Sequence, residues 1–488
     1  MTTKERLDPK VLGTAGILIT GALAVLFDTT IVGVALHSLA DDLHTSVATV
    51  QWVATAYLLA LGMTVPLSTW ATARFGGRRV WLFSLAVFMV GSVAAGASWN
   101  APALIAARVV QGVGGGLMMP VMTTLIVRAA GGRMLGRVTS IITLPAVLGP
   151  ILGPLVGGLI VTHLDWRWMF WVNIPLSVAG LVLAARFLDR DEPASRPRLD
   201  VVGFALLAPG IAAVLLGFSG ASDGGFAHAG VLVPLILGAV LVAGFVLYAI
   251  RRPEPLVDLR LFTHRPTSSS SAVLFFSGFS LYGALFLLPL FYQQVRGGSA
   301  LDAGIALIPQ GIGSLLSRTV AGQLTDRIGA RIITVVGFVV VGATTLPFAF
   351  ADAHTSAWSL AVMLLLRGIG LGAVTVPVFA VAYLGLGREQ VAHASALVRI
   401  AQQIGGSFGT AVLAVLLHRA AAGSGDLTAA FHEAFWWATG LAALAALLSL
   451  TLPSRKEAVE ASADEPERPS ESTRANRDEA QQVLDELV

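Results

Sequence analysis

The sequence predicts an all-α polytopic membrane protein, and three observations support this fold class. Only 12% of the 488 residues are charged, about half of the fraction that is usual in soluble proteins. Hydrophobic residues make up 55% of the chain, and its mean hydropathy is +0.77. The apolar residues also form continuous runs of about 20, the length that crosses a bilayer as a helix, whereas barrel strands would give short alternating segments.

Fourteen such runs can be delimited, because short charged or Gly/Pro breaks separate them. The first six form a predicted N-terminal bundle over 12–187, at 12–36, 49–72, 80–98, 101–127, 138–162 and 167–187. Two more, 201–219 and 230–250, are expected to form an inserted hairpin in a linker over 188–269. The last six form a C-terminal bundle over 270–452, at 270–294, 303–324, 332–350, 357–384, 394–417 and 431–452. At a rise of about 1.5 Å per residue, each run is long enough to cross.

The basic residues predict which side of the membrane each loop faces. With the N-terminus inside, 25 of the 32 Lys and Arg lie in inner loops and tails, against three, Arg167, Arg296 and Arg419, in outer loops. Because cytoplasmic loops carry an excess of basic residues, residues 1–11 and 453–488 are expected to be cytoplasmic. The tail is charged and poor in apolar residues, so we expect it to be disordered. The first run has no small-residue cleavage site, which predicts a retained helix rather than a signal peptide.

Residue types that the chain lacks exclude several classes of function. There are no cysteines, which excludes disulfides, thiolate metal sites and cysteine nucleophiles. No GxxxxGK[ST] loop occurs, so the chain is not itself an ATP-driven pump. The nine histidines have no metal-ligand spacing, and the net charge of +3 is too small to suggest nucleic acid. We therefore expect no enzyme activity, no cofactor, no metal and no nucleic-acid partner.

The two six-run halves carry related segments. Between the second and third runs the chain reads PLSTWATARFGGRRV, and between the tenth and eleventh it reads VAGQLTDRIGARII. The fourth run carries ARVVQGVGGG, and the twelfth carries LRGIGLGAV. Internal repeats that flank a midplane site are typical of secondary transporters, so the sequence predicts alternating access between two bundles.

These segments resemble the major facilitator superfamily, and more narrowly its 14-span drug:proton antiporter group. Matching segments occur in the expected order, at 26–36 (LFDTTIVGVAL), 108–116 (RVVQGVGGG), 145–158 (PAVLGPILGPLVGG), 166–175 (WRWMFWVNIP) and 288–309 (LPLFYQQVRGGSALDAGIALIP). The resemblance implies a bacterial cytoplasmic-membrane antiporter that exports lipophilic, often cationic, compounds. The chain departs from the group's pattern at Thr69 and Ala73 in the first loop motif, and at Gly33 and His37 in the first span.

Asp28 is the only carboxylate deep within a predicted span. It lies about 12 Å below the outer end of the first run, and Arg108 lies about 10 Å below that of the fourth. A charge at this depth is costly unless it is paired, hydrated or neutralised by a proton. Because burial and a nearby arginine act on ionisation in opposite directions, small structural changes could switch Asp28 between its protonation states. We predict that Asp28 and Arg108 couple transport to protons; the alternative is a fixed ion pair that orients the two helices.

Further residues are predicted to control conformation. Gln111 is expected to assist Arg108 or to bond the helix backbone. The resemblance implies that a bend in the fifth run prevents leakage during antiport, at Gly149, Pro150, Gly153, Pro154 and Gly157. The inner turns are predicted to carry latches at Arg74, Gly76 and Arg78 in the first half and at Asp326, Arg327 and Arg331 in the second. For the first-half arginines, the inner excess of positive charge is an equal explanation.

The substrate cavity is expected to be apolar and aromatic, because Met and aromatic side chains adapt to varied ligands and can hold cations over ring faces. The candidates are Trp52, Tyr57, Met118, Met122, Phe276, Tyr282, Phe286, Gln294, Arg367, Phe379 and Gln402. Arg367, the counterpart of Arg108 in the second half, either binds an anionic ligand or snorkels. The expected partners are small lipophilic substrates, protons and the lipid bilayer, and the expected state is a monomer.

Three other functions stay open at this point. The protein could be a dedicated exporter of one metabolite, siderophore or lipid. A channel would need a ring of pore charges and a membrane enzyme would need several convergent polar residues, and the sequence shows neither pattern. Saturable efflux that depends on a proton gradient would distinguish a transporter from a channel and from a membrane enzyme.

Overall fold

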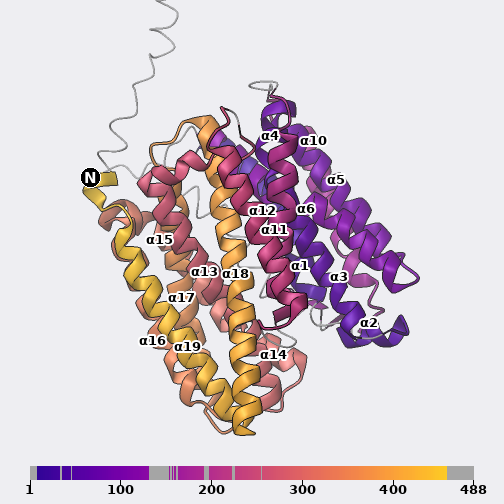
Figure 1. Ribbon diagram of the computed structural model, residues 1–488, viewed down its shortest axis with the longest axis vertical. Coiled ribbons are helices and arrows are strands. Elements are labelled where there is room, and N and C mark those ends of the chain that lie inside the picture. The colour runs from indigo at the N-terminus through magenta and orange to yellow at the C-terminus, as the bar shows by residue number, and fades with distance from the viewer. Residues whose placement is uncertain are drawn as a thin grey trace, which may run out of the picture.

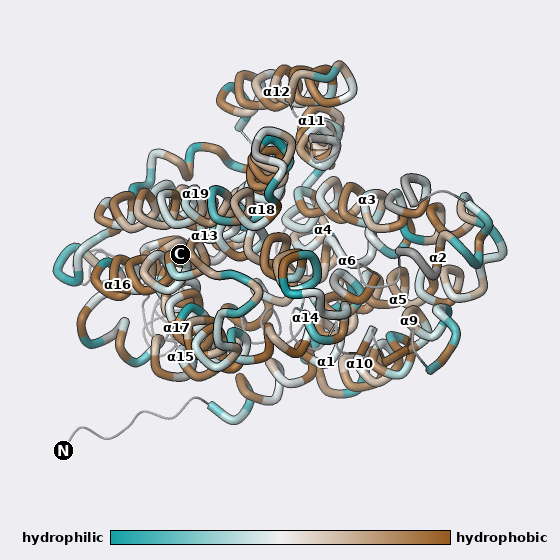
Figure 2. Tube along the Cα trace, turned by 90° about the horizontal axis from the view of Figure 1, so that it is seen from below, coloured by the Kyte–Doolittle hydropathy of each residue, from teal (hydrophilic) through white to brown (hydrophobic). Residues whose placement is uncertain are grey.

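The computed structural model describes residues 8–32, 36–45, 47–130, 153, 156–157, 159–160, 163–191, 197–221, 226–253 and 255–458. All regular structure in these ranges is helical (Figure 1). The long helices form two bundles that lie side by side, with a helical hairpin beside both of them (Figure 2). This architecture agrees with the fold class that the sequence predicts.

The N-terminal bundle is built from the first half of the predicted runs. Its long helices are α1 (Pro9–Ile31), α3 (Val47–Thr64), α4 (Leu67–Phe75), α5 (Gly77–Gly96), α6 (Ala101–Ala129) and α10 (Asn173–Phe187), and its short ones are α2 (Leu36–Asp42) and α9 (Trp168–Trp171). Side-chain caps determine where two of them begin. The Asp8 carboxylate accepts a hydrogen bond from the Lys10 N–H, and the Asn100 side chain accepts one from the Ala103 N–H, both at 2.8 Å. Each cap satisfies one of the backbone donors that a helix start leaves free.

The predicted run at 49–72 is not one straight helix. It is divided into α3 and α4, which meet at an angle of 55° next to Pro66. Proline has no N–H to donate and disfavours helical conformation in the preceding residue, so a bend is expected there. Hydropathy alone does not reveal the break, because both halves of the run are apolar.

The C-terminal bundle repeats this plan with longer helices. It contains α13 (Arg265–Leu290), α14 (Ala300–Ala306), α15 (Ile308–Ile328), α16 (Ala330–Thr345), α17 (Ala357–Ala382), α18 (Arg388–Ser424) and α19 (Leu427–Leu448), with short turns η2 (Leu259–Thr263), η3 (Phe291–Val295), η4 (Leu346–Phe350) and η5 (Ser449–Thr451). The helix α18 begins before the predicted run at 394–417, because its first residues are polar but still helical. Residues 455–458 are also helical and pack on this bundle, although the sequence predicts disorder from 453 onward.

The inserted hairpin consists of α11 (Val201–Ala221) and α12 (Ala229–Ala249). The helix α11 packs against α3 of one bundle and α18 of the other, and α12 packs chiefly on α11 (Figure 2). The Phe218 ring of α11 meets the Phe408 ring of α18 with centroids 5.3 Å apart. The hairpin therefore contacts both bundles at once rather than extending either of them.

The described residues contain eleven helices that are long and apolar enough to cross a membrane, or twelve if the bent pair α3–α4 counts as one span. The helix α15 matches the predicted tenth run but is too polar for this count, since it carries Gln310, Arg318 and Arg327. The predicted fifth run, 138–162, lies outside the described residues apart from 153, 156–157 and 159–160. The number fourteen thus stays a prediction.

The apolar core differs between the two ends of the molecule. At the end that carries α4, one cluster joins the bundles, with Met118 and Met122 of α6 packed in the same core as Val391 and Leu397 of α18. Near the end that carries α2 and α14 (Figure 1), each bundle has a core of its own, one containing Phe170 and the other Phe291. Among the described residues, a shared apolar core therefore joins the bundles at one end only.

Candidate functional site

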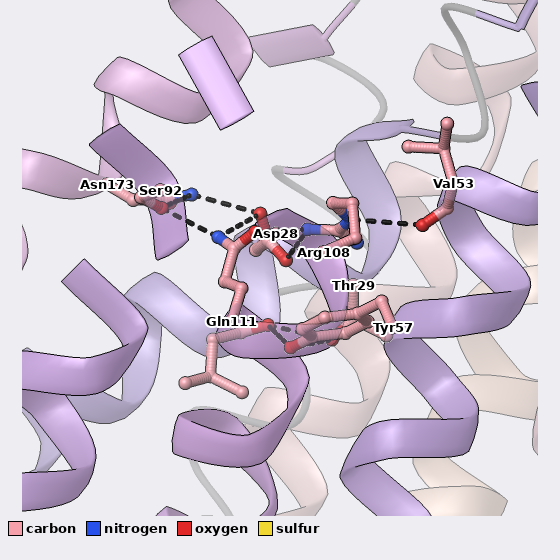
Figure 3. Close-up of polar contacts among 9 residues, drawn as sticks. Asp28, Thr29, Val53, Tyr57, Ser92, Arg108, Gln111 and Asn173 are labelled. Atoms are coloured by element: carbon pink, nitrogen blue, oxygen red, sulfur yellow. Dashed lines mark hydrogen bonds and ion pairs between the residues drawn. The ribbon is translucent and has the colours of Figure 1, made fainter. Parts of the chain in front are cut away.

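Asp28 lies in the interior of the N-terminal bundle, in an ion pair with Arg108 (Figure 3). Asp28 is on α1 and is 0% exposed, and Arg108 is on α6 and is 1% exposed. One guanidinium nitrogen of Arg108, Nη1, donates to Asp28 Oδ2, while Nε donates to the Val53 carbonyl of α3 at 3.1 Å. The structure therefore places these opposite charges in direct contact.

The second carboxylate oxygen of Asp28 is held by neutral amides. Gln111 Nε2 donates to Oδ1 at 2.8 Å, and Asn173 Nδ2 of α10 donates to the same atom at 3.1 Å (Figure 3). Both amides also reach Ser92 Oγ of α5, at 2.6 and 3.4 Å. Gln111 in addition accepts a hydrogen bond from Arg108 at 2.7 Å. We call these five residues the Asp28 network; they come from α1, α5, α6 and α10.

The sequence analysis identified three members of this network but missed Ser92 and Asn173. A signal for Asn173 is present, because the chain has only three asparagines and this is the only one within a predicted run. A polar amide at membrane depth is costly unless it is hydrogen-bonded, so it marks a polar site. Ser92 carries no comparable signal, since serines are common in these helices and usually bond their own backbone.

Tyr57 forms one wall of the network. Its ring lies under the Arg108 guanidinium, with the Cζ atom 4.0 Å from the ring centroid. Its hydroxyl lies 3.4 Å from both Thr29 Oγ1 and the Val25 carbonyl of α1 (Figure 3). A cation over an aromatic face is stabilised more strongly when water is excluded, as it is here. Tyr57 therefore links the position of α3 to the charge pair between α1 and α6.

Glycines allow α6 to bring Arg108 and Gln111 this close to the neighbouring helices. A Cβ atom on Gly112 would lie 2.5 Å from the Tyr57 carbonyl oxygen of α3. On the other side of α6, a Cβ atom on Gly114 would lie 2.5 Å from the Phe88 backbone nitrogen of α5. Real Cβ contacts are not this short, so any side chain here would force the helices apart. The motif at 112–116 is thus a helix-packing motif.

Gly112→Ala is expected to destabilise the folded protein by about 1–3 kcal/mol, the usual range for inserting a group into a packed core. Gly13→Ala is the matched control, because Gly13 is also helical and a Cβ atom there meets nothing within 4 Å. The control is expected to be neutral or slightly stabilising, because alanine favours helices over glycine. Thermal unfolding of the purified variants measures the difference, and equal shifts in Tm would contradict the close-approach account.

The C-terminal bundle has a buried arginine related to Arg108, and among the described residues this arginine is not paired with an acid as Arg108 is with Asp28. Arg367 of α17 is 3% exposed and donates to Thr345 Oγ1 at 3.0 Å and to Gln310 Oε1 at 2.8 Å. Its Nη2 donates to the Ser280 carbonyl of α13 at 2.9 Å and to Ser280 Oγ at 3.3 Å, so its acceptors on α13 are neutral. The two bundles therefore differ in charge at related positions.

Both turns that the sequence analysis predicts to lie on the inner side require glycine. Gly76, between α4 and α5, has φ +84°, and Gly329, between α15 and α16, has φ +90°. Other residues rarely adopt such angles. An acidic side chain that follows the last helix of each bundle holds each turn, and the sequence analysis missed both acids.

In the first half this acid is Asp191, which accepts hydrogen bonds from the Gly77 and Arg78 backbone N–H groups and lies 3.9 Å from Arg128. In the second half it is Glu457, which pairs with Arg265 and Arg331 at 3.1 Å each. Hydrogen bonds from the Ser454 backbone and hydroxyl, together with the two arginines, hold the pKa of Glu457 below its usual value. It therefore stays ionised at neutral pH.

The other predicted latch residues lie around these turns. Arg78 also donates to the Ala185 carbonyl, and Arg331 donates to the Leu452 carbonyl at 2.6 Å. Arg74 is in the last turn of α4, and Arg327 is exposed in the last turn of α15. Asp326 belongs to α15, but its side chain lies outside the described part of the chain.

The predicted fifth-run motif is described only in part. Gly149, Pro150 and Pro154 lie outside the described residues, whereas Gly153 and Gly157 are helical and buried. A Cβ atom on Gly157 would lie 2.9 Å from Ile31 Cγ1 and 3.0 Å from the Ile31 carbonyl oxygen. This glycine therefore allows close approach to α1, the helix that carries Asp28.

The predicted cavity residues have different surroundings. Met118, Met122 and Phe379 are buried in the core that joins the bundles, and Tyr57 is buried beside Arg108. Phe276, Tyr282, Phe286 and Gln402 are partly exposed. Trp52 is 45% exposed, and Gln294 is also exposed.

Two helical bundles around buried charges, with related halves, define a membrane transporter of the secondary class. The chain belongs to the Major Facilitator Superfamily, whose family model matches residues 18–410. It is 38% identical over 417 residues to the Multidrug resistance protein B homolog of Mycobacterium tuberculosis, covering 85% of this chain and 77% of that one. It is 29% identical over 455 residues to the lincomycin resistance protein LmrB of Listeria monocytogenes, covering 91% and 96%. A solved double-tryptophan variant of XylE has the same fold, with a TM-score of 0.65 and 16% identity over 93% of this chain and 98% of that one.

Proposed function

We propose that this protein is a proton-coupled antiporter that exports lipophilic, often cationic, drugs from the bacterial cytoplasm. The observation that carries the proposal is the fully buried carboxylate of Asp28, held by one cation and two neutral amides. A carboxylate at membrane depth marks a proton or ligand pathway by default. The names of the mycobacterial and listerial relatives support drug efflux as the task.

The network offers partners to Asp28 in both of its protonation states. When ionised, the carboxylate accepts bonds from Arg108, Gln111 and Asn173. When protonated, it needs an acceptor for its own O–H. Asn173 can supply one, because its Oδ1 atom has no hydrogen-bond partner among the described residues and a turn of the amide exchanges donor for acceptor.

Protonation of Asp28 then frees Arg108 from its counter-ion. The guanidinium keeps the Val53 carbonyl, Gln111 and the Tyr57 ring, which lie on α3 and α6. The tie between α1 and these two helices is weakened, so that α1 can shift relative to them. A cationic ligand that binds next to the ionised Asp28 carboxylate competes with the proton for it. This competition is the basis of exchange.

The orientation follows from the excess of basic residues, with both termini and the two glycine turns in the cytoplasm. In that orientation the core that joins the bundles closes the cytoplasmic end. This arrangement corresponds to a state that faces outward. The protein works as a monomer of fourteen spans, in which 12–187 and 270–452 form the two moving bundles and 188–269 carries the inserted hairpin.

Transport by the purified protein in proteoliposomes tests the proposal. A pH gradient is imposed in the absence of nucleotide, and the movement of a fluorescent lipophilic cation is followed together with the opposite movement of protons. We expect saturable uptake that stops when an ionophore collapses the gradient. Transport that continues without a gradient, or that proceeds without proton movement, would refute antiport.

Glu457→Gln is expected to slow transport severalfold while leaving expression and Tm nearly unchanged. The ion pairs with Arg265 and Arg331 are at least 30% exposed on each side, and such pairs contribute little to stability. They hold the second inner turn to the chain after α19, so their loss changes the equilibrium between conformations. Asp326→Asn, in the same turn, is expected to act alike. Wild-type rates in both variants would count against a latch.

A further inference from the structure

An open groove lies at the end of α12 in the inserted hairpin, apart from the Asp28 network. Its volume is about 480 Å³, and it is lined by Gly244, Leu247, Tyr248, Arg251 and Arg252. Residues three and four positions apart lie on the same face of a helix, so these five side by side line one face of α12 and its extension. The groove is apolar toward the middle of α12 and basic at its end.

The helix α12 is the candidate span that the bilayer contacts most. Only 17% of its most apolar stretch is buried, the lowest share among the candidate spans of the described residues. Figure 2 shows α12 on the far side of α11 from both bundles. Ile236, Val240 and Leu247 are each at least 60% exposed, so an apolar surface leads along α12 to the groove. The groove therefore opens toward lipid rather than toward the protein interior.

The two arginines of the groove have no acidic partner among the described residues. No ion pair within 4.0 Å involves either of them in that part of the chain. Glu254, the next acid along the chain, lies outside the described residues. Even with Glu254 counted, the segment 251–260 holds three arginines against two acids, and one of these acids, Asp258, caps η2. This end of α12 therefore keeps an excess of positive charge.

Arg252 is held in place by a chain of hydrogen bonds. Asp200, just before α11, accepts bonds from the backbone N–H groups of Gly203 and Leu256 at 2.9 and 3.2 Å. It also accepts one from the Tyr248 hydroxyl at 2.7 Å, and that hydroxyl accepts one from Arg252 Nε at 2.8 Å. Within the described residues, the Nη1 and Nη2 groups of Arg252 make no hydrogen bond and can bind an anion. An arginine that only snorkels needs no such positioning.

We propose that this groove binds an anionic phospholipid, with the phosphate at the two arginines and an acyl chain along Gly244 and Leu247. Guanidinium groups bind phosphate through paired, charge-assisted hydrogen bonds. Gly244 leaves room for the chain, because a Cβ atom there would meet only Leu206 Cδ2, at 3.7 Å. In the orientation that the basic residues predict, the lipid belongs to the inner leaflet, where basic pockets bind such headgroups.

This assignment goes beyond the proposed function and does not rest on it. Lipid binding needs neither a proton gradient nor a substrate. Asp28→Asn is therefore expected to bind the lipid as the wild type does. Failure of lipid binding and failure of antiport are separate outcomes.

Native mass spectrometry of the full-length protein in a neutral detergent tests the proposal, because it counts bound lipids. Dioleoyl phosphatidylglycerol and dioleoyl phosphatidylcholine, which have the same acyl chains, are titrated separately. We expect the first phosphatidylglycerol to bind at lower concentration than the first phosphatidylcholine. Arg251→Gln combined with Arg252→Gln should weaken the first phosphatidylglycerol site about tenfold or more, because two charged contacts with the phosphate are lost.

Arg186→Gln combined with Arg190→Gln is the matched control for charge. It removes two exposed arginines at the end of another candidate span, that of α10, outside the groove. The first phosphatidylglycerol site should keep its affinity in this variant. Equal affinities of the wild type for the two lipids, or equal effects of the two double variants, would overturn the proposal.

Gly244→Leu tests the apolar part of the groove while keeping both arginines. Its side chain fills the space of the acyl chain, so phosphatidylglycerol binding should weaken severalfold. Gly230→Leu is its control, because Gly230 is near the start of the same helix and a Cβ atom there meets nothing within 4 Å. If Gly244→Leu binds phosphatidylglycerol as Gly230→Leu does, the acyl chain does not lie in the groove and the assignment is wrong.

The same spectra distinguish the lipid from two other occupants. A dimer that disappears in the variant lacking both Arg251 and Arg252 would assign the groove to a second copy of the chain. Displacement of phosphatidylglycerol by an equal concentration of inorganic phosphate would mean that the site holds free phosphate. Either result would overturn the lipid assignment, and we expect neither.

Discussion

Asp28→Asn is expected to abolish proton-coupled transport while leaving the protein folded. The amide has the shape of the carboxylate and can still bond Gln111 and Asn173, but it cannot exchange a proton. Gradient-driven uptake in proteoliposomes should therefore fall to the level of protein-free vesicles. Substrate-induced proton release, measured with a pH dye, should disappear together with it.

Asp41→Asn is the matched control for this experiment. Asp41 is an exposed acid at the end of the same bundle, in α2, and its loss should leave coupling intact. Binding of the substrate to the Asp28 variant, measured without a gradient, separates a coupling defect from a binding defect. Unchanged proton stoichiometry in Asp28→Asn would mean that the ion pair only orients the helices.

Arg108→Met is expected to cause the largest loss of stability of any single change considered for this protein. It leaves the Asp28 carboxylate buried without its cation, and breaking a buried ion pair in this way costs about 3–5 kcal/mol. The change also removes the contacts of the guanidinium with the Val53 carbonyl and the Tyr57 ring. A lower Tm of the purified variant, with little monodisperse protein, is the expected measurement.

The double variant Asp28→Asn with Arg108→Met should regain most of that stability. With both charges removed, no ion is left unpaired, and neutral replacements of similar size are often tolerated in place of a buried pair. Transport should stay absent, because the proton carrier is missing. If the double variant is no more stable than Arg108→Met alone, the cost arises from lost packing rather than from the unpaired charge.

The expected effects on stability can be compared with the second half of the chain, because Arg367 has a place related to that of Arg108. Arg367 is stabilised by Gln310, Thr345 and Ser280 rather than by an acid. Removing Asp28 alone therefore converts the first network into something close to the second. A buried arginine can thus be satisfied by neutral acceptors as well as by a carboxylate.

Most of the architecture could be predicted from hydropathy, because each apolar run must become a helix in lipid, where backbone groups find no water to bond. The same reasoning identifies Asp28 and Arg108, since charges at membrane depth stand out against apolar neighbours. It does not reveal the bend at Pro66 between α3 and α4. That bend is a local break, which an average over an apolar run conceals.

The sequence by itself determined the helical membrane fold, the related halves and the one buried acid, because these follow from residue type and order along the chain. Only the tertiary structure decided which side chains complete the sites. Ser92 and Asn173 reach Asp28 from α5 and α10, and Asp191 and Glu457 reach turns more than a hundred residues away. Hydrogen bonds act over about 3 Å in space, and sequence spacing does not encode that proximity once helices from distant segments meet.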